Sequence, residues 1–277
     1  MIETMIEEII TKVIACKNCG STACVKFGTY KGVQRYYCKD CKRKFKADDS
    51  AFHTKKPAEW ESSAVDMYFR GMAVSDIREH LKQEHGYSPS KSVIYDWIDK
   101  YTTLATKHFR DYHPEVGNIW IADETMLDVD GEHKVWFYDI IDRDTRFLLA
   151  SRVALSRTTR NAESLMKDAE KCAGKKPIEV ITDQNNSYVD GVPEAFGNDT
   201  EHIIGNPFAL KETGDSTSEI ERFHGTLKDR TKVFRAFRDV ETLIQFTDGW
   251  LVYYNYFKPH ESLDGKTPAQ DFYCKMK

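Results

Sequence analysis

Four cysteines form the pattern in this sequence with the most direct chemical meaning. They occur as two CxxC pairs separated by eighteen residues: Cys16, Cys19, Cys38 and Cys41. Two such pairs supply four thiolates, which is the tetrahedral ligand set of structural zinc sites. Because sulfur fills all four positions around the ion, no position remains for water or substrate. We therefore expect one structural Zn²⁺ in this short segment.

A second chemical pattern consists of carboxylates dispersed over the rest of the chain. Asp123 lies inside a predicted strand, Asp183 lies at the end of another, and Glu221 lies in a long predicted helix. Carboxylates bind Mg²⁺ or Mn²⁺, and two such ions about 3.5–4 Å apart support in-line phosphoryl displacement. Carboxylates are common, however, so this trio has competitors. They are Glu124, Asp128, Asp139, Asp142 and Glu219.

The helix that contains Glu221 has two adjoining faces. Glu221, His224 and Lys228 are spaced i, i+3 and i+7, so they share one face. An apolar stripe lies beside them and predicts burial along one side: Ile220, Phe223 and Leu227. Lys228 could hold a DNA phosphate, or it could be a solvated surface charge. His224 could orient water or the scissile group, or it could be a packing histidine.

The elements that must position the carboxylates follow from the hydrophobic pattern after Gly117. Three strands joined by tight turns are predicted at residues 118–129, 134–141 and 146–153. A helix is predicted at 161–172, a short buried strand at 177–182, a further strand at 201–204 and the long helix from about Ser216. This order predicts an α/β domain with a mixed sheet, in which three carboxylates could meet at one edge.

The cysteine-containing segment is strongly basic. Between Ile9 and Ala47 there are ten Lys/Arg residues and one acid, a local net charge of +9, whereas the whole chain has a net charge of −4. Between the CxxC pairs, Val25–Tyr37 alternates like a hairpin with a turn at Lys31–Gly32. We expect a zinc ribbon that binds nucleic-acid phosphates without necessarily reading sequence.

Three short helices are predicted to follow the ribbon. Helical periodicity is found in Ala58–Arg70, from Val74 to near Gly86, and again from Ser90. A glycine-containing turn after the first helix favours a helix-turn-helix, whose last helix would enter a DNA major groove. A plain helical linker between two domains is the alternative.

Length and composition limit the protein class. A chain of 277 residues is long enough for more than one domain. No apolar run approaches the roughly 18 residues of a membrane span, and the acidic N-terminus does not resemble a secretory signal. We expect a cytoplasmic protein with no membrane partner.

Four motifs resemble those of prokaryotic insertion-sequence transposases with a retroviral-integrase-like DDE catalytic core. The first three contain the carboxylates: Trp120–Thr125, Ile181–Asp183 and Ile220–Lys228. The fourth resembles the closing segment of integrase-core proteins: Tyr254-Asn255, Pro259-His260, Leu263 and Thr267-Pro268. The resemblance covers about residues 115–272. Two positions depart from the family pattern, because Lys258 stands where arginine is frequent and Ser218 where asparagine is frequent.

The resemblance implies a ribonuclease-H-like fold and a catalytic triad of Asp123, Asp183 and Glu221. Glu221 is preferred to Glu219 because the family has a basic residue seven positions after its glutamate, which is Lys228 here. The implied cofactors are two Mg²⁺ or Mn²⁺ ions at the triad. The implied reaction is hydrolysis at transposon ends followed by strand transfer into target DNA, performed by a homodimer or higher oligomer.

We therefore expect three modules. They are a zinc ribbon at residues 1–48, a helix-turn-helix-like module at 57–112 and a ribonuclease-H-like catalytic domain at 115–277. A DNA partner would place the protein at the nucleoid. Three alternative functions remain: a nuclease of the same fold, a zinc-ribbon DNA-binding regulator derived from a transposase, and a purely structural assembly protein.

Overall fold

The computed structural model describes seven segments of the chain. They are residues 16–30, 33–46, 58–109, 112–131, 133–205, 217–234 and 236–270. The chain divides into two compact units. One comprises Met1–Tyr68 and Val74–Trp97, and the other comprises Phe69–Ala73 and Ile98–Lys277.

The cysteine-containing segment is a small antiparallel sheet, as expected of a ribbon. Its strands pair in the order β1 (Cys24–Tyr30), β2 (Val33–Cys38) and β3 (Lys44–Lys46). The predicted turn at Lys31–Gly32 lies outside the described residues. Tyr36 stacks on Phe45 with ring centroids 5.8 Å apart. Apart from this aromatic pair, the small core of the ribbon consists of cysteines, so it has little apolar material of its own.

Three helices follow, close to their predicted bounds. They are α2 (Ala58–Phe69), α3 (Val74–His85) and α4 (Lys91–Phe109). The turn between the first two contains Gly71, whose φ of +105° strongly favours glycine. Trp60 of α2 stacks on His85 of α3 with ring centroids 4.6 Å apart. The three helices and the glycine turn are found where the sequence predicts them, and the helix-turn-helix interpretation stays a prediction.

The central domain contains one five-stranded sheet. Its strands are β4 (Ile119–Val129), β5 (His133–Asp142), β6 (Leu148–Ala154), β7 (Glu179–Thr182) and β8 (Glu201–Ile204). They are ordered β6-β5-β4-β7-β8. The first three form the predicted antiparallel meander, and β7 and β8 are parallel to β4 and to each other. The expected ribonuclease-H-like mixed sheet is therefore confirmed.

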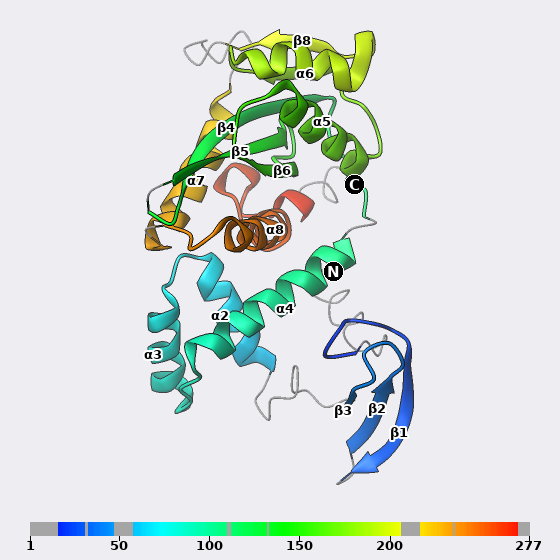
Figure 1. The fold of residues 1–277 in the computed structure, drawn as a ribbon, viewed down its shortest axis with the longest axis vertical. Coiled ribbons are helices and arrows are strands. Elements are labelled where there is room, and N and C mark those ends of the chain that lie inside the picture. Colours follow the sequence, from blue (N-terminus) through cyan, green and yellow to red (C-terminus); the bar gives the residue numbers. More distant parts are fainter. Residues whose placement is uncertain are drawn as a thin grey trace. The chain divides into compact units, whose positions relative to one another are not determined.

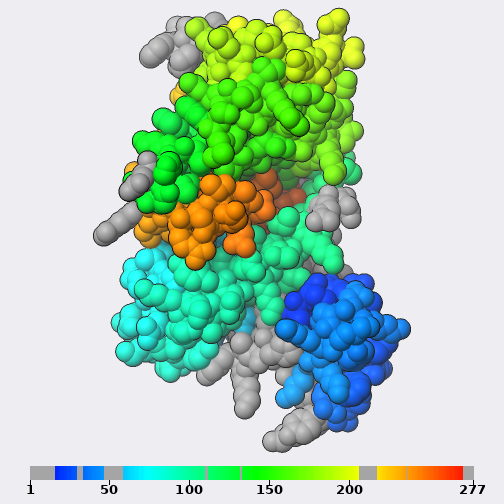
Figure 2. Space-filling view, viewed as in Figure 1, coloured from blue at the N-terminus to red at the C-terminus, as the bar shows by residue number. Residues whose placement is uncertain are grey.

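Helices flank this sheet (Figure 1). They are α5 (Thr159–Ala173), α6 (Asn186–Phe196), α7 (Ser218–Thr231) and α8 (Val240–Tyr256). The first two pack on the face that carries Trp120, Tyr138 and Val180, where the main hydrophobic core lies. In the space-filling view, the green and yellow-green segments that include these two helices form a continuous surface (Figure 2).

The other helices contact the sheet through polar as well as apolar side chains. Asn255 of α8 accepts a hydrogen bond from the backbone N–H of Leu148 and donates one to its carbonyl, both at 2.8 Å. Phe223 of α7 packs edge-on against Tyr254 of α8, with centroids 4.9 Å apart. Helix α7 also contacts β4 and β5, the strands that carry Asp123 and Asp139. Among the described residues, no helix is long and apolar enough to cross a membrane.

Candidate active site

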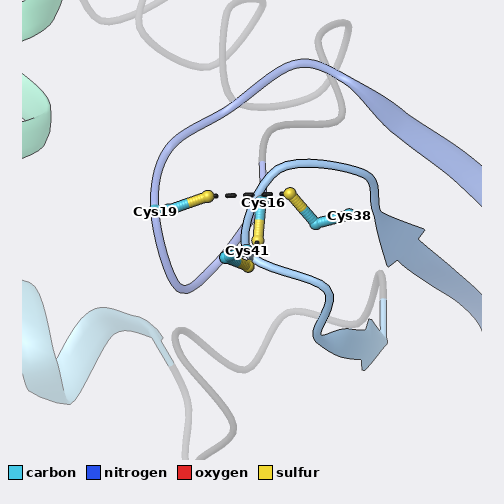
Figure 3. A group of neighbouring side chains, drawn as sticks. All are labelled: Cys16, Cys19, Cys38 and Cys41. Carbon is cyan, nitrogen blue, oxygen red and sulfur yellow. Dashed lines mark hydrogen bonds between the residues drawn. The ribbon is translucent and has the colours of Figure 1, made fainter.

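The four predicted zinc ligands are brought together in the ribbon. Cys16 and Cys19 precede β1, whereas Cys38 ends β2 and Cys41 lies in the turn after it, and their side chains converge (Figure 3). The Sγ atoms of Cys16 and Cys41 are 3.4 Å apart, and those of Cys19 and Cys38 are 3.6 Å apart. In a tetrahedral site with zinc–sulfur bonds of about 2.3 Å, the sulfur atoms lie roughly 3.8 Å apart. The donor set and its geometry therefore fit Zn²⁺.

Cys24 lies beside these ligands but is not one of them. It pairs in register with Cys38 across the first two strands. Burial raises the pKa of the Cys24 thiol to about 11, so this cysteine stays protonated at neutral pH. Cys24 is therefore not a candidate ligand.

The second cluster lies where β4 and β7 run side by side. Because Ile121 pairs with Ile181 in parallel register, the chain continues to Asp123 and Asp183 at neighbouring positions. Each of Asp123, Glu124 and Asp183 offers an oxygen within 4.8 Å of the others. Three carboxylates at this spacing form a hard oxygen donor set that fits a divalent cation such as Mg²⁺ or Mn²⁺.

Backbone N–H groups hold the two aspartates in place. Asp123 Oδ1 accepts a hydrogen bond from the N–H of Glu124 at 2.8 Å, and Asp183 Oδ1 accepts one from the N–H of Asn185 at 2.9 Å. Burial, assisted by the charge of Asp123, raises the pKa of Asp183. A bound cation would relieve this unfavourable environment of the ionised carboxylate.

Glu124 joins this cluster although the sequence marked it only as a competitor. Its side chain is 3% exposed. It accepts a hydrogen bond from Asn185 Nδ2 at 2.5 Å and pairs with Arg157 Nη1 at 3.3 Å. Arg157 in turn lies over the ring of Trp136, 4.2 Å from its centroid. Adjacency to Asp123 was the one signal for Glu124, and nothing in the local pattern pointed to Asn185 or Arg157.

Glu221 lies in the first turn of α7 and is exposed. It is not part of the group of mutually close oxygens among the described residues. The hydroxyl of Thr217 donates to Glu221 Oε1 at 3.2 Å. Lys228, two turns further along the helix, is exposed as well. The structure thus brings two of the three predicted ligands together and leaves the third on the helix beside them.

His224 connects α7 to the sheet. It is 5% exposed and lies between two carboxylates. Its Nδ1 is 3.4 Å from Asp123 Oδ2, and its Nε2 is 3.0 Å from Asp139 Oδ2. Although burial opposes the charged form, contacts with these two aspartates raise the pKa of His224 to about 9. The contact with Asp123 places the α7 turn that carries Glu221 beside the carboxylate cluster.

The carboxylate cluster is therefore compatible with divalent cations, and the same chain contains a basic module whose four cysteines are compatible with a metal ion such as Zn²⁺. Residues 117–260 match the family described as the DDE domain of IS240-type transposases. No curated protein matches the sequence.

Several solved structures resemble part of the chain. The HTLV-2 integrase catalytic core domain in complex with magnesium is 15% identical, with 57% of this chain and 97% of that chain covered and a TM-score of 0.44. The simian T-cell lymphotropic virus intasome in complex with PP2A regulatory subunit B56 gamma is 14% identical, covering 75% and 73%, with a TM-score of 0.45. The BIV integrase catalytic core domain is 14% identical, covering 58% and 96%, with a TM-score of 0.41.

Proposed function

The chain belongs to the DDE domain family of IS240-type transposases, and from this premise we propose that it cuts DNA at transposon ends and joins them to target DNA. The observation that carries the proposal is the proximity of the Asp123 and Asp183 carboxylates, which lie on the parallel strand β4 and directly after its neighbour β7. Family membership supports transposition or integration of DNA in general. Cleavage and strand transfer by two metal ions are the finer steps that we propose.

In this proposal, Asp123, Asp183 and Glu221 are the metal ligands. Asp123 lies in β4 and Asp183 directly follows β7, whereas Glu221 lies exposed on α7, and its side chain is proposed to turn toward the aspartates when the cations bind. Two Mg²⁺ or Mn²⁺ ions, when bound, would activate the attacking oxygen and stabilise the leaving one. Lys228, on the same helix face as Glu221, holds a phosphate of the DNA strand that enters the site.

The N-terminal modules supply the DNA binding that positions this site. We propose that residues 1–48 bind DNA phosphates through a zinc ribbon and that residues 57–112 form the helix-turn-helix-like reader. Residues 115–277 form the catalytic domain. Because strand transfer joins two transposon ends to one target, the active species is a homodimer or a larger oligomer, located at the nucleoid.

Strand transfer in vitro tests the proposal. The purified protein is incubated with Mg²⁺ or Mn²⁺, a labelled duplex carrying the terminal repeat of the element, and a target plasmid. We expect a joined product that disappears in Asp123→Asn, Asp183→Asn and Glu221→Gln, while each variant still binds the duplex. Each substitution removes a ligand charge but little volume, so DNA binding serves as the control for folding.

Other outcomes would favour the alternatives. Metal-dependent cleavage without joining would favour a nuclease, and DNA binding without either reaction would favour a regulator derived from a transposase. Normal cleavage by any one of the three variants would show that the residue is not a required ligand.

A further inference from the structure

A row of polar side chains crosses the sheet toward the candidate metal cluster. Ser151 of β6 lies opposite Asp139 of β5, and Asp139 lies opposite Asp123 of β4. Residues that lie directly opposite each other in antiparallel strands project to the same face of the sheet. Here it is the face packed against α7, because Asp123 and Asp139 both contact His224. The row is continuous from β6 to the cluster.

Asp139 is fully buried, and both of its oxygens are engaged within this row. The hydroxyl of Ser151 donates to Oδ1 at 2.6 Å, and His224 Nε2 contacts Oδ2 at 3.0 Å. Asp139 is not in the group of mutually close carboxylate oxygens found among the described residues, so we do not expect it to bind the cations itself. Burial of an ionisable side chain is costly unless it is paired. Asp139 thus occupies a core position that an apolar residue would fill at lower cost.

His224 transmits this arrangement to Asp123. With Nε2 fixed on Asp139, the imidazole plane is fixed and Nδ1 is directed at Asp123 Oδ2, 3.4 Å away. The other oxygen of Asp123 accepts the N–H of Glu124 at 2.8 Å. These contacts on both oxygens fix the orientation of the Asp123 carboxylate. The orientation in turn determines which lone pairs of the carboxylate face the cluster. Outer hydrogen bonds of this kind orient metal ligands, and their loss typically reduces metal affinity about 10–100-fold.

We propose that Ser151, Asp139 and His224 are positioning residues that orient the Asp123 carboxylate for binding the divalent cation. The inference rests on the proposed function, in which Asp123 is a metal ligand. In this inference, His224 contacts the metal ligand Asp123 and does not act on water or on the scissile phosphate.

Binding of Mn²⁺ alone to the full-length, zinc-loaded protein tests the inference, with free Mn²⁺ measured by electron paramagnetic resonance. We expect Asp139→Asn and His224→Gln to weaken Mn²⁺ binding about 10–100-fold. Asp142→Asn is the matched control. Asp142 is also a buried aspartate of β5, but its carboxylate accepts hydrogen bonds from the N–H and hydroxyl of Thr145. This control should bind Mn²⁺ like the wild type, and melting temperatures check the fold of each variant.

A milder variant covers the case in which Asp139→Asn does not fold. Ser151→Ala removes one hydrogen bond from Asp139 and should weaken Mn²⁺ binding by about a factor of a few. Wild-type affinity in Ser151→Ala, Asp139→Asn and His224→Gln would overturn the inference, as would an equal loss in Asp142→Asn. Asp123→Asn separates the two hypotheses. Unchanged Mn²⁺ binding in this variant would overturn the metal site and the proposed function together, whatever the other variants do.

Discussion

At the residue scale, two glutamates compete to complete the pair formed by Asp123 and Asp183. Glu124 is nearer to the pair, but its carboxylate is enclosed by Asn185 and paired with Arg157. Glu221 is exposed, with a hydroxyl contact from Thr217, and is free of such an enclosure. A carboxylate already neutralised by an arginine contributes less to cation binding than one without such a partner. Proximity to the aspartates alone therefore does not decide which glutamate binds metal.

Paired substitutions distinguish these glutamates. We expect Glu221→Gln to abolish Mg²⁺-dependent cleavage of a labelled duplex, because it removes a metal ligand. Glu124→Gln should lower the cleavage rate only about 10–100-fold, because it disturbs the hydrogen bonds around Asp183. Retention of the duplex by each variant in a binding assay is the control. The reverse order, with Glu221→Gln cutting normally and Glu124→Gln inactive, would transfer the ligand role to Glu124.

A separate prediction concerns Lys228 and the salt dependence of DNA affinity. Its exposed ammonium group stands on the helix face that carries Glu221. If it neutralises one phosphate, Lys228→Ala should lower the slope of log affinity against log salt concentration by about one. Lys232→Ala is the matched control, because Lys232 is exposed nearby and its Nζ pairs with Asp229 at 2.5 Å. Equal slopes in wild type and Lys228→Ala would exclude the phosphate contact.

At the element scale, the close packing of α5 on α6 depends on one glycine. A Cβ at Gly191 would lie 2.7 Å from the Cβ of Ala162 and 3.2 Å from the backbone N of Glu163. Backbone cannot move aside as a flexible side chain can. The two helices must separate for any larger residue at position 191, and the core that they cover would loosen.

We expect Gly191→Ala to destabilise the central domain by about 1–3 kcal/mol, because overpacking forces backbone shifts. Gly225→Ala is the matched control in α7, since nothing lies within 4 Å of the added Cβ. This control should be neutral or stabilising by up to about 1 kcal/mol, because alanine favours helix. Urea unfolding followed by circular dichroism measures the free energy of unfolding of both variants. Equal stability of the two variants would contradict the packing argument.

The sequence predicted the strands of the central sheet well, because their apolar runs and turns are local signals. It did not predict α6, whose interior contains Gly191 and Pro193, two residues that disfavour helices. The helix exists because its apolar face packs into the core against α5. The sequence did not predict the role of Asp139 either. Its contact with His224 joins positions 85 residues apart, and only the folded chain brings them together.

At the scale of the whole molecule, charge is divided between modules. The segment from Ile9 to Ala47 has a net charge of +9, although the chain as a whole has a net charge of −4. Phosphate neutralisation by basic residues dominates nonspecific DNA affinity. Because the chain as a whole has a net negative charge, we expect this segment to supply the attraction to DNA that the proposed function requires. The acidic cluster lies in the other compact unit.

This division of charge predicts that loss of zinc lowers the affinity for DNA and leaves the unfolding temperature of the five-stranded sheet unchanged. Cys38→Ser removes a thiolate ligand, so we expect it to lose the one bound Zn²⁺ and to lower DNA affinity by about tenfold or more, because the ribbon needs its ion to fold. Cys24→Ser is the control, since Cys24 lies opposite Cys38 in the hairpin but outside the ligand group. It should keep both its zinc and its DNA affinity.

Zinc content is measured by atomic absorption, duplex binding by fluorescence anisotropy, and stability by thermal unfolding. Because the sheet lies in the other compact unit, its unfolding temperature should be the same in both variants. A zinc-free Cys38→Ser protein that binds DNA like the wild type would show that the ribbon is not the source of this attraction.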